Sequence, residues 1–350
     1  MDIKELGEFG LIRHLTDNIK LKNASSVKGV GDDCAILNFS GEKDVLVTTD
    51  LLLEGVHFDL TYVPLKHLGY KSAMVNFSDV YAMGGIPRQI TVSLGISQRF
   101  KVEDMEEFYA GLQLACENHG VDLVGGDTTS SMTGLTISIT CVGDTEKGKA
   151  VCRNGAKPTD LICVSGNLGA AYLGLQLLER EKEVYYQQLQ ESKGQETLET
   201  AQPDFAGKEY LLQRQLRPEA RRDIIMRFRE LGLQPTSMMD ISDGLSSELM
   251  HICSQSQCGC RIYEAKLPID YETASQAEEF NMNVTTCALN GGEDYELLCT
   301  FPLSAKDILE KVEDLHLIGY VTSKEDGLKL VTRDNNEFEL KAQGWNHLKD

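Results

Sequence analysis

Five short segments of the chain place an aspartate beside glycine, serine or threonine, and most of them end an apolar run. A carboxylate with a small neighbour suits one coordinating position of a hard divalent cation such as Mg²⁺, which prefers oxygen ligands. One such segment is ordinary turn chemistry, because aspartate bonds nearby backbone and glycine accepts positive φ. Five together predict a fold that gathers them into a site for metal ions and phosphate. They are Gly31-Asp32-Asp33, Thr48-Thr49-Asp50, Asn76-Phe77-Ser78-Asp79, Gly125-Gly126-Asp127-Thr128 and Ser242-Asp243-Gly244.

Length and charge limit what kind of protein this can be. A chain of 350 residues exceeds what one core usually supports, so we expect two domains. Acidic residues outnumber basic ones by 54 to 34, which gives a net charge of −20. This charge argues against nucleic acid or an anionic membrane as a partner, and an anionic substrate would need bridging cations. An acidic surface is also a common solubility device, so charge alone leaves both interpretations open.

The sequence indicates neither a membrane anchor nor a disulfide framework. No stretch approaches the roughly 20 apolar residues of a membrane span, and the first residues lack a basic region followed by an apolar run. We therefore expect a cytoplasmic protein. Several of the ten cysteines lie in apolar, strand-like runs, where a reduced thiol packs as a small hydrophobe. The cluster of Cys253, Cys258 and Cys260 lacks the paired spacing of a structural zinc site, which we disfavour.

Strand and helix signals alternate along the first part of the chain and predict an α/β domain. Turn formers and charge between residues 143 and 158 predict a linker, and we place the domain boundary between residues 148 and 149. The predicted strands of the first domain are residues 45–49, 88–96, 121–124 and 135–142, and its predicted helices are 66–83 and 104–119.

The second domain is predicted to be α+β. The Gln- and Glu-rich residues 180–205 have few apolar side chains and predict an exposed insertion, either helical or disordered. A hairpin is expected at residues 334–336. The other predicted elements are strands at 161–164, 237–240, 260–263, 295–301 and 316–321, and helices at 170–179, 218–230 and 245–254.

Common catalytic motifs are absent. The nearest approach to a P-loop runs from Gly143 to Lys149, but Ala150 replaces the hydroxyl residue that would hold Mg²⁺. Two aspartates follow Gly29-Val30-Gly31 and would repel a pyrophosphate, so a dinucleotide-binding fingerprint fails there. No G-x-S-x-G elbow and no H-E-x-x-H zinc pattern occurs. These absences disfavour hydrolases of the elbow type and zinc enzymes.

The order of the aspartate segments and the residues within them resemble one protein family over nearly the whole chain. Matching text includes Gly29-Val30-Gly31-Asp32-Asp33-Cys34-Ala35, Thr48-Thr49-Asp50 through Gly55-Val56-His57-Phe58, and Gly291-Gly292-Glu293-Asp294-Tyr295-Glu296-Leu297. With the remaining aspartate segments, they resemble the thiamine-monophosphate kinase family of the aminoimidazole ribonucleotide synthetase-like superfamily. The resemblance implies a two-domain fold whose N-terminal α/β domains pair through their sheets in a homodimer. It also implies that ATP and several Mg²⁺ ions lie in a cleft between domains.

The resemblance also implies roles for individual residues. Alone, His57 would as readily be a packed histidine, and Trp345 could simply cap the core. The implied metal ligands are Asp32, Asp33, Thr48, Thr49, Asp50, Asp79, Asp127, Asp243 and Ser246; which of Asp32 and Asp33 binds directly stays open. The implied ATP contacts are Tyr109, Gly126, Asp127, Arg153 and Leu245, and the implied contacts to thiamine monophosphate are His57, Glu293, Glu296 and Trp345.

The implied reaction transfers the γ-phosphoryl group of ATP to thiamine monophosphate and yields thiamine diphosphate. A phosphate monoester has a second pKa of about 6, so the acceptor oxygen is already ionised and no general base is expected. Glycines such as Gly126 and Gly244 would let backbone approach phosphate. The alternatives are another ATP-dependent enzyme of the superfamily, either selenophosphate synthetase-like or purine-biosynthetic, and a non-catalytic nucleotide- or metal-binding scaffold.

Overall fold

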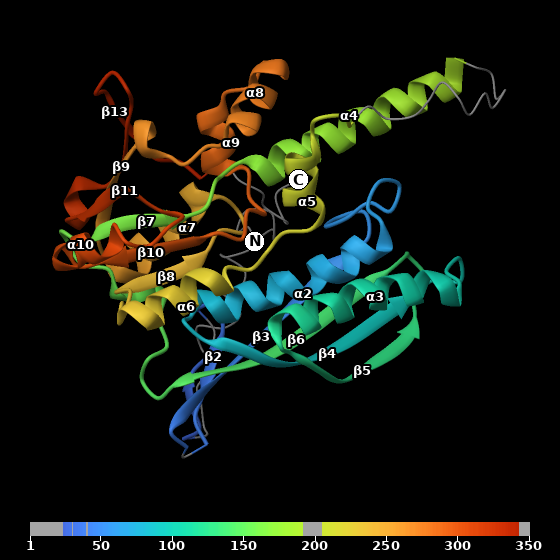
Figure 1. Cartoon of the computed structure of the whole chain (residues 1–350), viewed down its shortest axis with the longest axis horizontal. Helices are drawn as coiled ribbons and strands as arrows, with labels where there is room; N and C mark the ends of the chain where they lie inside the picture. The colour runs from blue at the N-terminus through green and yellow to red at the C-terminus, as the bar shows by residue number, and fades with distance from the viewer. Residues whose placement is uncertain (1–23, 30, 40, 192–204, 343–350) are drawn as a thin grey trace, which may run out of the picture.

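The computed structural model describes residues 24–29, 31–39, 41–191 and 205–342. Two β-sheets follow one another along the chain, and helices lie between and around them (Figure 1). No helix among these residues is both long and apolar enough to cross a membrane.

The first sheet has six strands in the order β1-β2-β3-β6-β4-β5. Only β4 and β5 pair in parallel, and β3 pairs with β6 along its full length. Helices α2 and α3 cover one face of this sheet (Figure 1). The elements are β1 (Ser26–Lys28), β2 (Ala35–Leu37), β3 (Lys43–Leu53), α2 (Leu65–Ala82), β4 (Ile86–Ile96), α3 (Val102–His119), β5 (Asp122–Ser130) and β6 (Thr136–Glu146).

The second sheet has seven strands in the order β13-β12-β9-β11-β7-β10-β8, and only β9 and β12 pair in parallel. A short 3₁₀ turn, η1 (Arg153–Gly155), precedes it. Its strands are β7 (Leu161–Ser165), β8 (Ser237–Asp240), β9 (Gly259–Tyr263), β10 (Leu297–Phe301), β11 (Leu315–Thr322), β12 (Leu328–Val331) and β13 (Glu337–Glu339). Its helices are α4 (Ala170–Glu191), α5 (Glu209–Leu216), α6 (Arg222–Leu231), α7 (Leu245–Ser256), α8 (Tyr271–Glu279), α9 (Val284–Asn290) and α10 (Lys306–Leu309).

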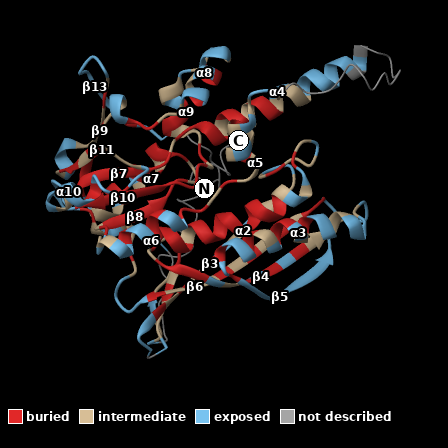
Figure 2. Cartoon of the chain, in the orientation of Figure 1, coloured by how far each residue is buried: buried red, intermediate tan, exposed pale blue. Residues whose placement is uncertain are grey.

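Helix α2 lies between the two sheets and is buried on nearly all sides (Figure 2). A helix that is apolar all round belongs in an interior, and α2 contacts β3, β4 and β6 of the first sheet as well as β8 of the second. One hydrophobic cluster continues across this layer: it includes Phe77 and Phe108 from the first half and Phe228 and Phe301 from the second. The shared core therefore fixes how the two halves meet.

The predicted fold class is confirmed, because both halves mix strands and helices around separate sheets. The predicted strand at residues 237–240, the helices at 66–83 and 245–254, and the hairpin at 334–336 also appear, with ends shifted by at most two residues. The ten cysteines, all among the described residues, are free as expected.

Several boundary predictions were wrong. The strands predicted to end at residues 49 and 124 are β3 and β5, which continue to Leu53 and Ser130. Residues 143–146, assigned to the linker, continue strand β6, where Arg88 and Lys43 hold the carboxylate of Asp144. The helix predicted from residue 218 begins at Arg222. The helix predicted to end at residue 179 is α4, which continues to Glu191 with a largely exposed second half; the rest of the expected insertion, residues 192–204, lies outside the described residues.

Candidate active site

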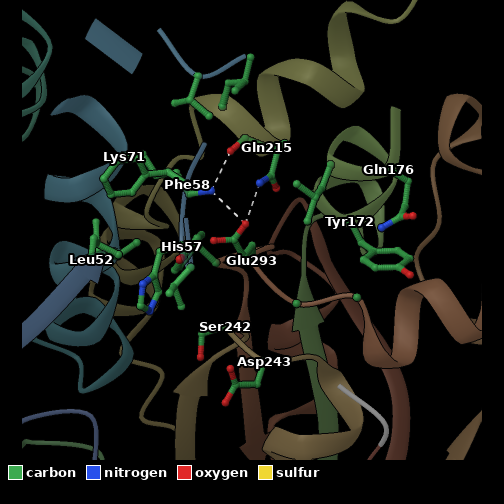
Figure 3. A pocket seen from close by; sticks show the side chains of 18 of the residues that line it. Leu52, His57, Phe58, Lys71, Tyr172, Gln176, Gln215, Ser242, Asp243 and Glu293 are labelled. Atoms are coloured by element: carbon green, nitrogen blue, oxygen red, sulfur yellow. Dashed lines mark hydrogen bonds and ion pairs between the residues drawn. The ribbon is translucent and has the colours of Figure 1, made fainter. Parts of the chain in front are cut away.

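A cleft of about 1050 Å³ lies where the two halves meet. Its lining comes from the end of β3, the loop at residues 54–63 and helix α2 on one side. On the other side it comes from α4, α5, the turn after β8 and the loop before β10. Figure 3 shows part of this lining, with His57 and Lys71 from the first half facing Glu293 and Asp243 from the second. The junction between the halves, where a shared site was expected, is therefore hollow.

Three carboxylates from separate parts of the chain meet at the edge of this cleft: Asp79 and Asp240 line it, and Asp33 lies beside them. One oxygen each of Asp33, Asp79 and Asp240 lies within 4.8 Å of the others. Asp33 precedes β2, Asp79 lies near the end of α2, and Asp240 is the last residue of β8. The buried helix α2 brings its carboxylate to β8, so the core described above is what assembles the cluster.

Neighbouring side chains hold these carboxylates in place. The hydroxyl of Thr48 donates to Asp79 Oδ2 at 2.5 Å, and the hydroxyl of Ser78 donates to Asp240 Oδ2 at 2.6 Å. Asp33 receives two bonds from the guanidinium of Arg153, Nη2 to Oδ1 at 2.8 Å and Nε to Oδ2 at 3.2 Å. Each carboxylate is thus oriented by a donor from its own surroundings.

Asp32 lies beside this cluster and makes different contacts. It forms an ion pair with Lys28, and its Oδ1 accepts a bond from the backbone N–H of Arg153 at 2.7 Å. The first contact ties Asp32 to the end of β1, and the second ties the β1–β2 connection to η1. Asp33 lies in the three-carboxylate group and Asp32 does not, so the geometry favours Asp33 as the direct ligand of the two.

Burial and mutual repulsion raise the carboxyl pKa values in this region. Burial raises the pKa of Asp50, on β3, to about 6. Burial, followed by the charge of Asp33, raises the pKa of Asp240 to about 8. The pKa of Asp79 is also raised, first by burial and then by the charges of Asp50, Asp240 and Asp33. Carboxylates that cannot ionise together without cost are a recurrent feature of functional sites.

The donor set fits Mg²⁺. Every candidate ligand is an oxygen, and Mg²⁺ requires oxygen ligands. Asp50 Oδ2 is buried and accepts no hydrogen bond from any described residue, although buried carboxylate oxygens are normally satisfied. A cation would satisfy this oxygen and relieve the repulsion that raises the neighbouring pKa values. Asp33, Asp50, Asp79 and Asp240 are therefore the residues best placed to hold divalent ions.

The turn after β8 adds a further acidic group. Asp243 lines the cleft, and its backbone N–H donates to Glu248 Oε1 at 2.9 Å. Burial, then the charge of Asp243, raises the pKa of Glu248. The predicted ligand Ser246 is fully buried in the first turn of α7, and its hydroxyl has no hydrogen-bond partner among the described residues. The predicted ATP contact Leu245 packs in the core beneath this turn.

Two residues with a predicted role in substrate binding line the cleft. His57 Nδ1 accepts a bond from the backbone N–H of Leu53 at 3.0 Å, which orients the ring. Glu293 forms an ion pair with Lys71 at 3.0 Å and accepts a bond from Gln215 Nε2 at 2.8 Å. The third such residue, Trp345, lies outside the described residues.

Glu296, the fourth, does not line the cleft. It is 1% exposed and forms ion pairs with Arg221 at 2.5 Å and Arg214 at 2.9 Å, while the hydroxyl of Ser165 donates to it at 2.6 Å. A buried carboxylate between two guanidinium groups is a structural centre of the second half. The resemblance implies substrate contacts at both Glu293 and Glu296; of the two, only Glu293 lines the cleft, and both roles stay predictions.

We therefore expect Glu296→Gln to act on stability. Removing one partner of a buried ion pair costs about 3 kcal/mol. Glu296 is the carboxylate that both guanidinium groups share, although Arg214 would keep Asp294, and Arg221 would keep Asp223 and Asp314, as acidic partners. Denaturant unfolding should show this loss, while KM for the organic substrate stays within about twofold of the wild-type value at a permissive temperature. A large rise in KM with unchanged unfolding would restore the assignment to substrate binding.

The structure does not bring Thr49 and Asp127 into the cleft. Side chains alternate along a strand, so Thr48 is buried while Thr49 is exposed and donates to the carbonyl of Ile139 across to β6. Asp127 lies on edge strand β5, three strands from β3, or about 14 Å at the usual strand spacing. It lines a separate groove of about 300 Å³ with Ser93 and Ser138. Their roles as metal ligands stay predictions.

The two glycines expected to make room for phosphate lie against backbone atoms of the protein itself. A Cβ on Gly126 would lie 1.9 Å from the carbonyl oxygen of Val92, so this glycine lets β5 pair closely with β4. At Gly244, where φ is 119°, a Cβ would lie 2.9 Å from Asn290 Cα. Both glycines serve packing within the protein. Tyr109, a predicted ATP contact, packs against Phe108 on α3 and does not line the cleft.

Two cleft residues were missed from sequence. Asp240 ends a buried strand, but Met239 and Ile241 flank it, so a search for aspartate beside small residues passes over it. Its position three residues before Asp243 was the available signal. Lys71 lies in the middle of α2, which is buried over most of its length, whereas Lys66, the other lysine of this helix, is exposed in its first turn. A lysine so far inside a mostly apolar helix was a signal for a buried charge with a specific partner.

Comparisons with known proteins agree with this geometry. A protein-family model described as "AIR synthase related protein, N-terminal domain" matches residues 31–145. The chain is 38% identical over 347 residues to a thiamine-monophosphate kinase of Aquifex aeolicus (strain VF5), covering 99% of this chain and 100% of the relative. It is 33% identical over 353 residues to a thiamine-monophosphate kinase of Bacillus subtilis (strain 168), covering 98% and 100%.

A solved structure described as "AaThiL complexed with AMPPCP and TMP" matches the fold with a TM-score of 0.81 at 35% identity, covering 99% of both chains. Both kinases named above exceed 30% identity to this chain, and each match spans nearly the full length of the chain and of the relative. The chain belongs to the thiamine-monophosphate kinase family.

Proposed function

We propose that this protein transfers the γ-phosphoryl group of ATP to the phosphate of thiamine monophosphate, giving thiamine diphosphate and ADP. The observation that carries the proposal is the group of Asp33, Asp79 and Asp240 at the cleft between the two halves. Two relatives are named thiamine-monophosphate kinase, and the related solved structure is described with AMPPCP and TMP. A cleft lined by carboxylates on a protein of net charge −20 can accept two phosphate compounds only with cations.

The proposed step is a direct displacement. An oxygen of the acceptor phosphate forms a bond to the γ-phosphorus while the bond from that phosphorus to the β–γ bridging oxygen breaks, and the electron pair leaves with ADP. The acceptor is already ionised near neutral pH, so no side chain needs to remove a proton. Mg²⁺, when bound, neutralises charge on the phosphate oxygens.

The chain's own residues orient the groups that take part. Arg153 holds Asp33, Thr48 holds Asp79 and Ser78 holds Asp240, so the ligands are in place before substrate enters. His57 and Glu293 line the cleft and are proposed to contact thiamine monophosphate. We place the boundary between an N-terminal and a C-terminal domain at residues 148 and 149, a division supported by the end of one sheet at Glu146 and the start of the next at Leu161.

The proposal is tested by incubating the protein with ATP, Mg²⁺ and thiamine monophosphate and separating the thiamine products. We expect thiamine diphosphate and ADP in equal amounts. ADP release without thiamine diphosphate would point to another activity of the superfamily, and turnover of neither compound would point to a binding scaffold. Either result contradicts the proposal.

We also propose that two copies pair through their first sheets. Every residue of β5 is exposed, including Leu123 and Val124, and an uncapped apolar edge strand is a hazard unless another chain covers it. Leu51, 53% exposed, adds an apolar side chain at the end of β3. In such a dimer the second copy would cover the strand that carries Asp127.

Light scattering should therefore give a mass about twice 38.8 kDa. Val124→Lys places a charge on the exposed edge and should shift the protein towards monomer, because charged edge residues block strand pairing. Met226→Lys is the matched control, because Met226 is also an exposed apolar residue but lies on α6, outside the first sheet, and this change should leave the mass unchanged. A wild-type monomer, or a dimer that survives Val124→Lys, would contradict this pairing.

A further inference from the structure

Lys71 is a buried cation at the wall of the cleft. It lies in the middle of α2, and its side chain is 9% exposed. Its Nζ donates to the backbone carbonyl of Gln215 on α5 at 3.0 Å and to Glu293 Oε2 at 3.0 Å (Figure 3). An ammonium group is kept at such a site only when its partners compensate for lost water, so these contacts have a definite geometry.

The same contacts fix the carboxylate of Glu293. Gln215 Nε2 also donates to Oε2, so this one oxygen receives both donors. The backbone of Glu293 has φ 56°, and its N–H donates to the carbonyl of Ser242 at 2.6 Å. A non-glycine residue keeps such a conformation where its surroundings enforce it, often at ligand sites. Oε1 accepts no hydrogen bond from a described residue, and the side chain lines the cleft.

Gln215 presents a second acceptor beside it. A carboxylate only accepts hydrogen bonds, so the amide nitrogen of Gln215 must face Glu293 and its oxygen must face away. That Oε1 is buried and has no hydrogen-bond partner among the described residues, although Gln215 is only 5% exposed. Two neighbouring acceptors that lack donors, at the wall of a cleft, fit a ligand with two N–H bonds.

Helix α2 relates this place to the metal cluster. Lys71, Val75 and Asp79 lie on one face of α2, and all three line the cleft. Eight residues at 1.5 Å each put Lys71 and Asp79 about 12 Å apart along the helix. A phosphate held near Asp79 therefore leaves the rest of an extended substrate to reach towards Lys71. In thiamine monophosphate, the part farthest from the phosphate is an aminopyrimidine ring, whose exocyclic amine has two N–H bonds.

We propose that Lys71 is a positioning residue which, with Gln215, holds Glu293 so that Glu293 Oε1 and Gln215 Oε1 accept the two N–H bonds of the aminopyrimidine amine. Lys71 would thus set which ring the cleft accepts without touching the reacting phosphates. This inference rests on the proposed function, because thiamine monophosphate is the ligand that it places in the cleft.

The test compares binding of thiamine monophosphate and oxythiamine monophosphate, in which a carbonyl oxygen replaces the amine. Calorimetry is done on the full chain with Mg²⁺ and a non-hydrolysable ATP analogue. The wild-type protein should bind the amine form at least about tenfold more tightly, because the carbonyl form leaves both acceptors unpaired. Lys71→Met should reduce this ratio below about threefold, and Lys71→Arg should restore part of it.

Glu293→Gln gives a sharper outcome. Its amide oxygen must face the donors of Lys71 and Gln215, so its amide N–H₂ would face the cleft. This variant should reverse the preference and bind the carbonyl form more tightly. Lys208→Met is the matched control, because Lys208 precedes α5 and pairs with Glu279 at 2.7 Å outside the cleft. Its ratio should equal the wild-type ratio, and circular dichroism checks that every variant is folded.

Three results would overturn the inference: a wild-type ratio near one, a wild-type ratio in folded Lys71→Met, or an amine preference retained by Glu293→Gln. Formation of thiamine diphosphate is measured separately on the wild-type protein. Discrimination without turnover would remove the proposed function and keep the amine site. Turnover without discrimination would remove only the amine site.

Discussion

Replacing Asp50 with asparagine should abolish most phosphoryl transfer while leaving the protein folded. Asp50 Oδ2 is a buried carboxylate oxygen without a described hydrogen-bond donor, and Asp50 lines the cleft together with Asp79. Losing one charge-neutralising group at a phosphoryl-transfer site costs roughly 10²–10³ in kcat. Because burial already raises the pKa of Asp50 to about 6, a neutral amide should be tolerated, and thermal stability without metal should be equal or higher.

The control for this prediction is a second buried aspartate on the same strand. Asp44 accepts bonds from Asn38 Nδ2 and from the backbone N–H of Gly148, both at 2.7 Å, and does not line the cleft. Asp44→Asn should lower stability and keep kcat within about threefold of wild type once folded. Near-normal turnover by Asp50→Asn at saturating Mg²⁺ would contradict a role for Asp50 in holding the metal.

The stability of the metal-free protein should fall as pH rises from about 4 to about 8. Folding raises the pKa of Asp50 from 3.8 to about 6 and that of Asp240 from 3.8 to about 8. The folded state therefore binds more protons than the unfolded state in this window, and stability decreases with pH wherever that holds. The facing groups include Asp33, Asp79 and the guanidinium of Arg153. The shift of Asp50 alone, about two pKa units, corresponds to about 3 kcal/mol, so we expect a loss of at least this size, measured by denaturant unfolding in the presence of a chelator.

Millimolar Mg²⁺ should reverse this loss, and its effect should be larger at about pH 8 than at about pH 5. Metal ions bind deprotonated carboxylates, so the cation competes with protons at low pH and meets ionised ligands at high pH. Asp240→Asn should flatten the metal-free pH profile, because it removes the group whose pKa is raised to about 8. If the stability of the metal-free protein stays constant or rises with pH across this range, the claim that burial and mutual repulsion raise the pKa values of these carboxyl groups is contradicted.

Local pattern predicted the elements that this site depends on. Helix α2 was evident because residues 66–83 form a long apolar stretch that ends at two glycines, and β8 was evident as a short apolar run. Asp79, near the end of α2, and Asp243, in the turn after β8, were recognised as candidate ligands, whereas Asp240 at the end of β8 was not. Asp33, Asp50, Asp79 and Asp243 do line or border one cleft. Most residues of the site lie on or next to helices and strands that are evident from local sequence, so much of the site could be predicted.

What could not be predicted depends on register and packing. Nothing local separates Thr48 from Thr49, yet the pairing of β3 with β6 buries the first and exposes the second. Glu293 and Glu296 stand three residues apart, but a backbone with positive φ at Glu293 and Tyr295 leaves one at the cleft and the other between two arginines. The partners of Lys71 come from α5 and a distant loop, which no sequence window contains.

The central claim is that the carboxylates at the junction of the two halves hold the ions that let one phosphate attack another. Its most direct test is a crystal structure of the protein with Mn²⁺, a non-hydrolysable ATP analogue and thiamine monophosphate, with anomalous scattering used to locate the metal. We predict anomalous peaks within coordination distance of Asp33, Asp79 and Asp240, next to the phosphates of both ligands. Phosphates bound in the cleft with no anomalous peak at these carboxylates would contradict the claim.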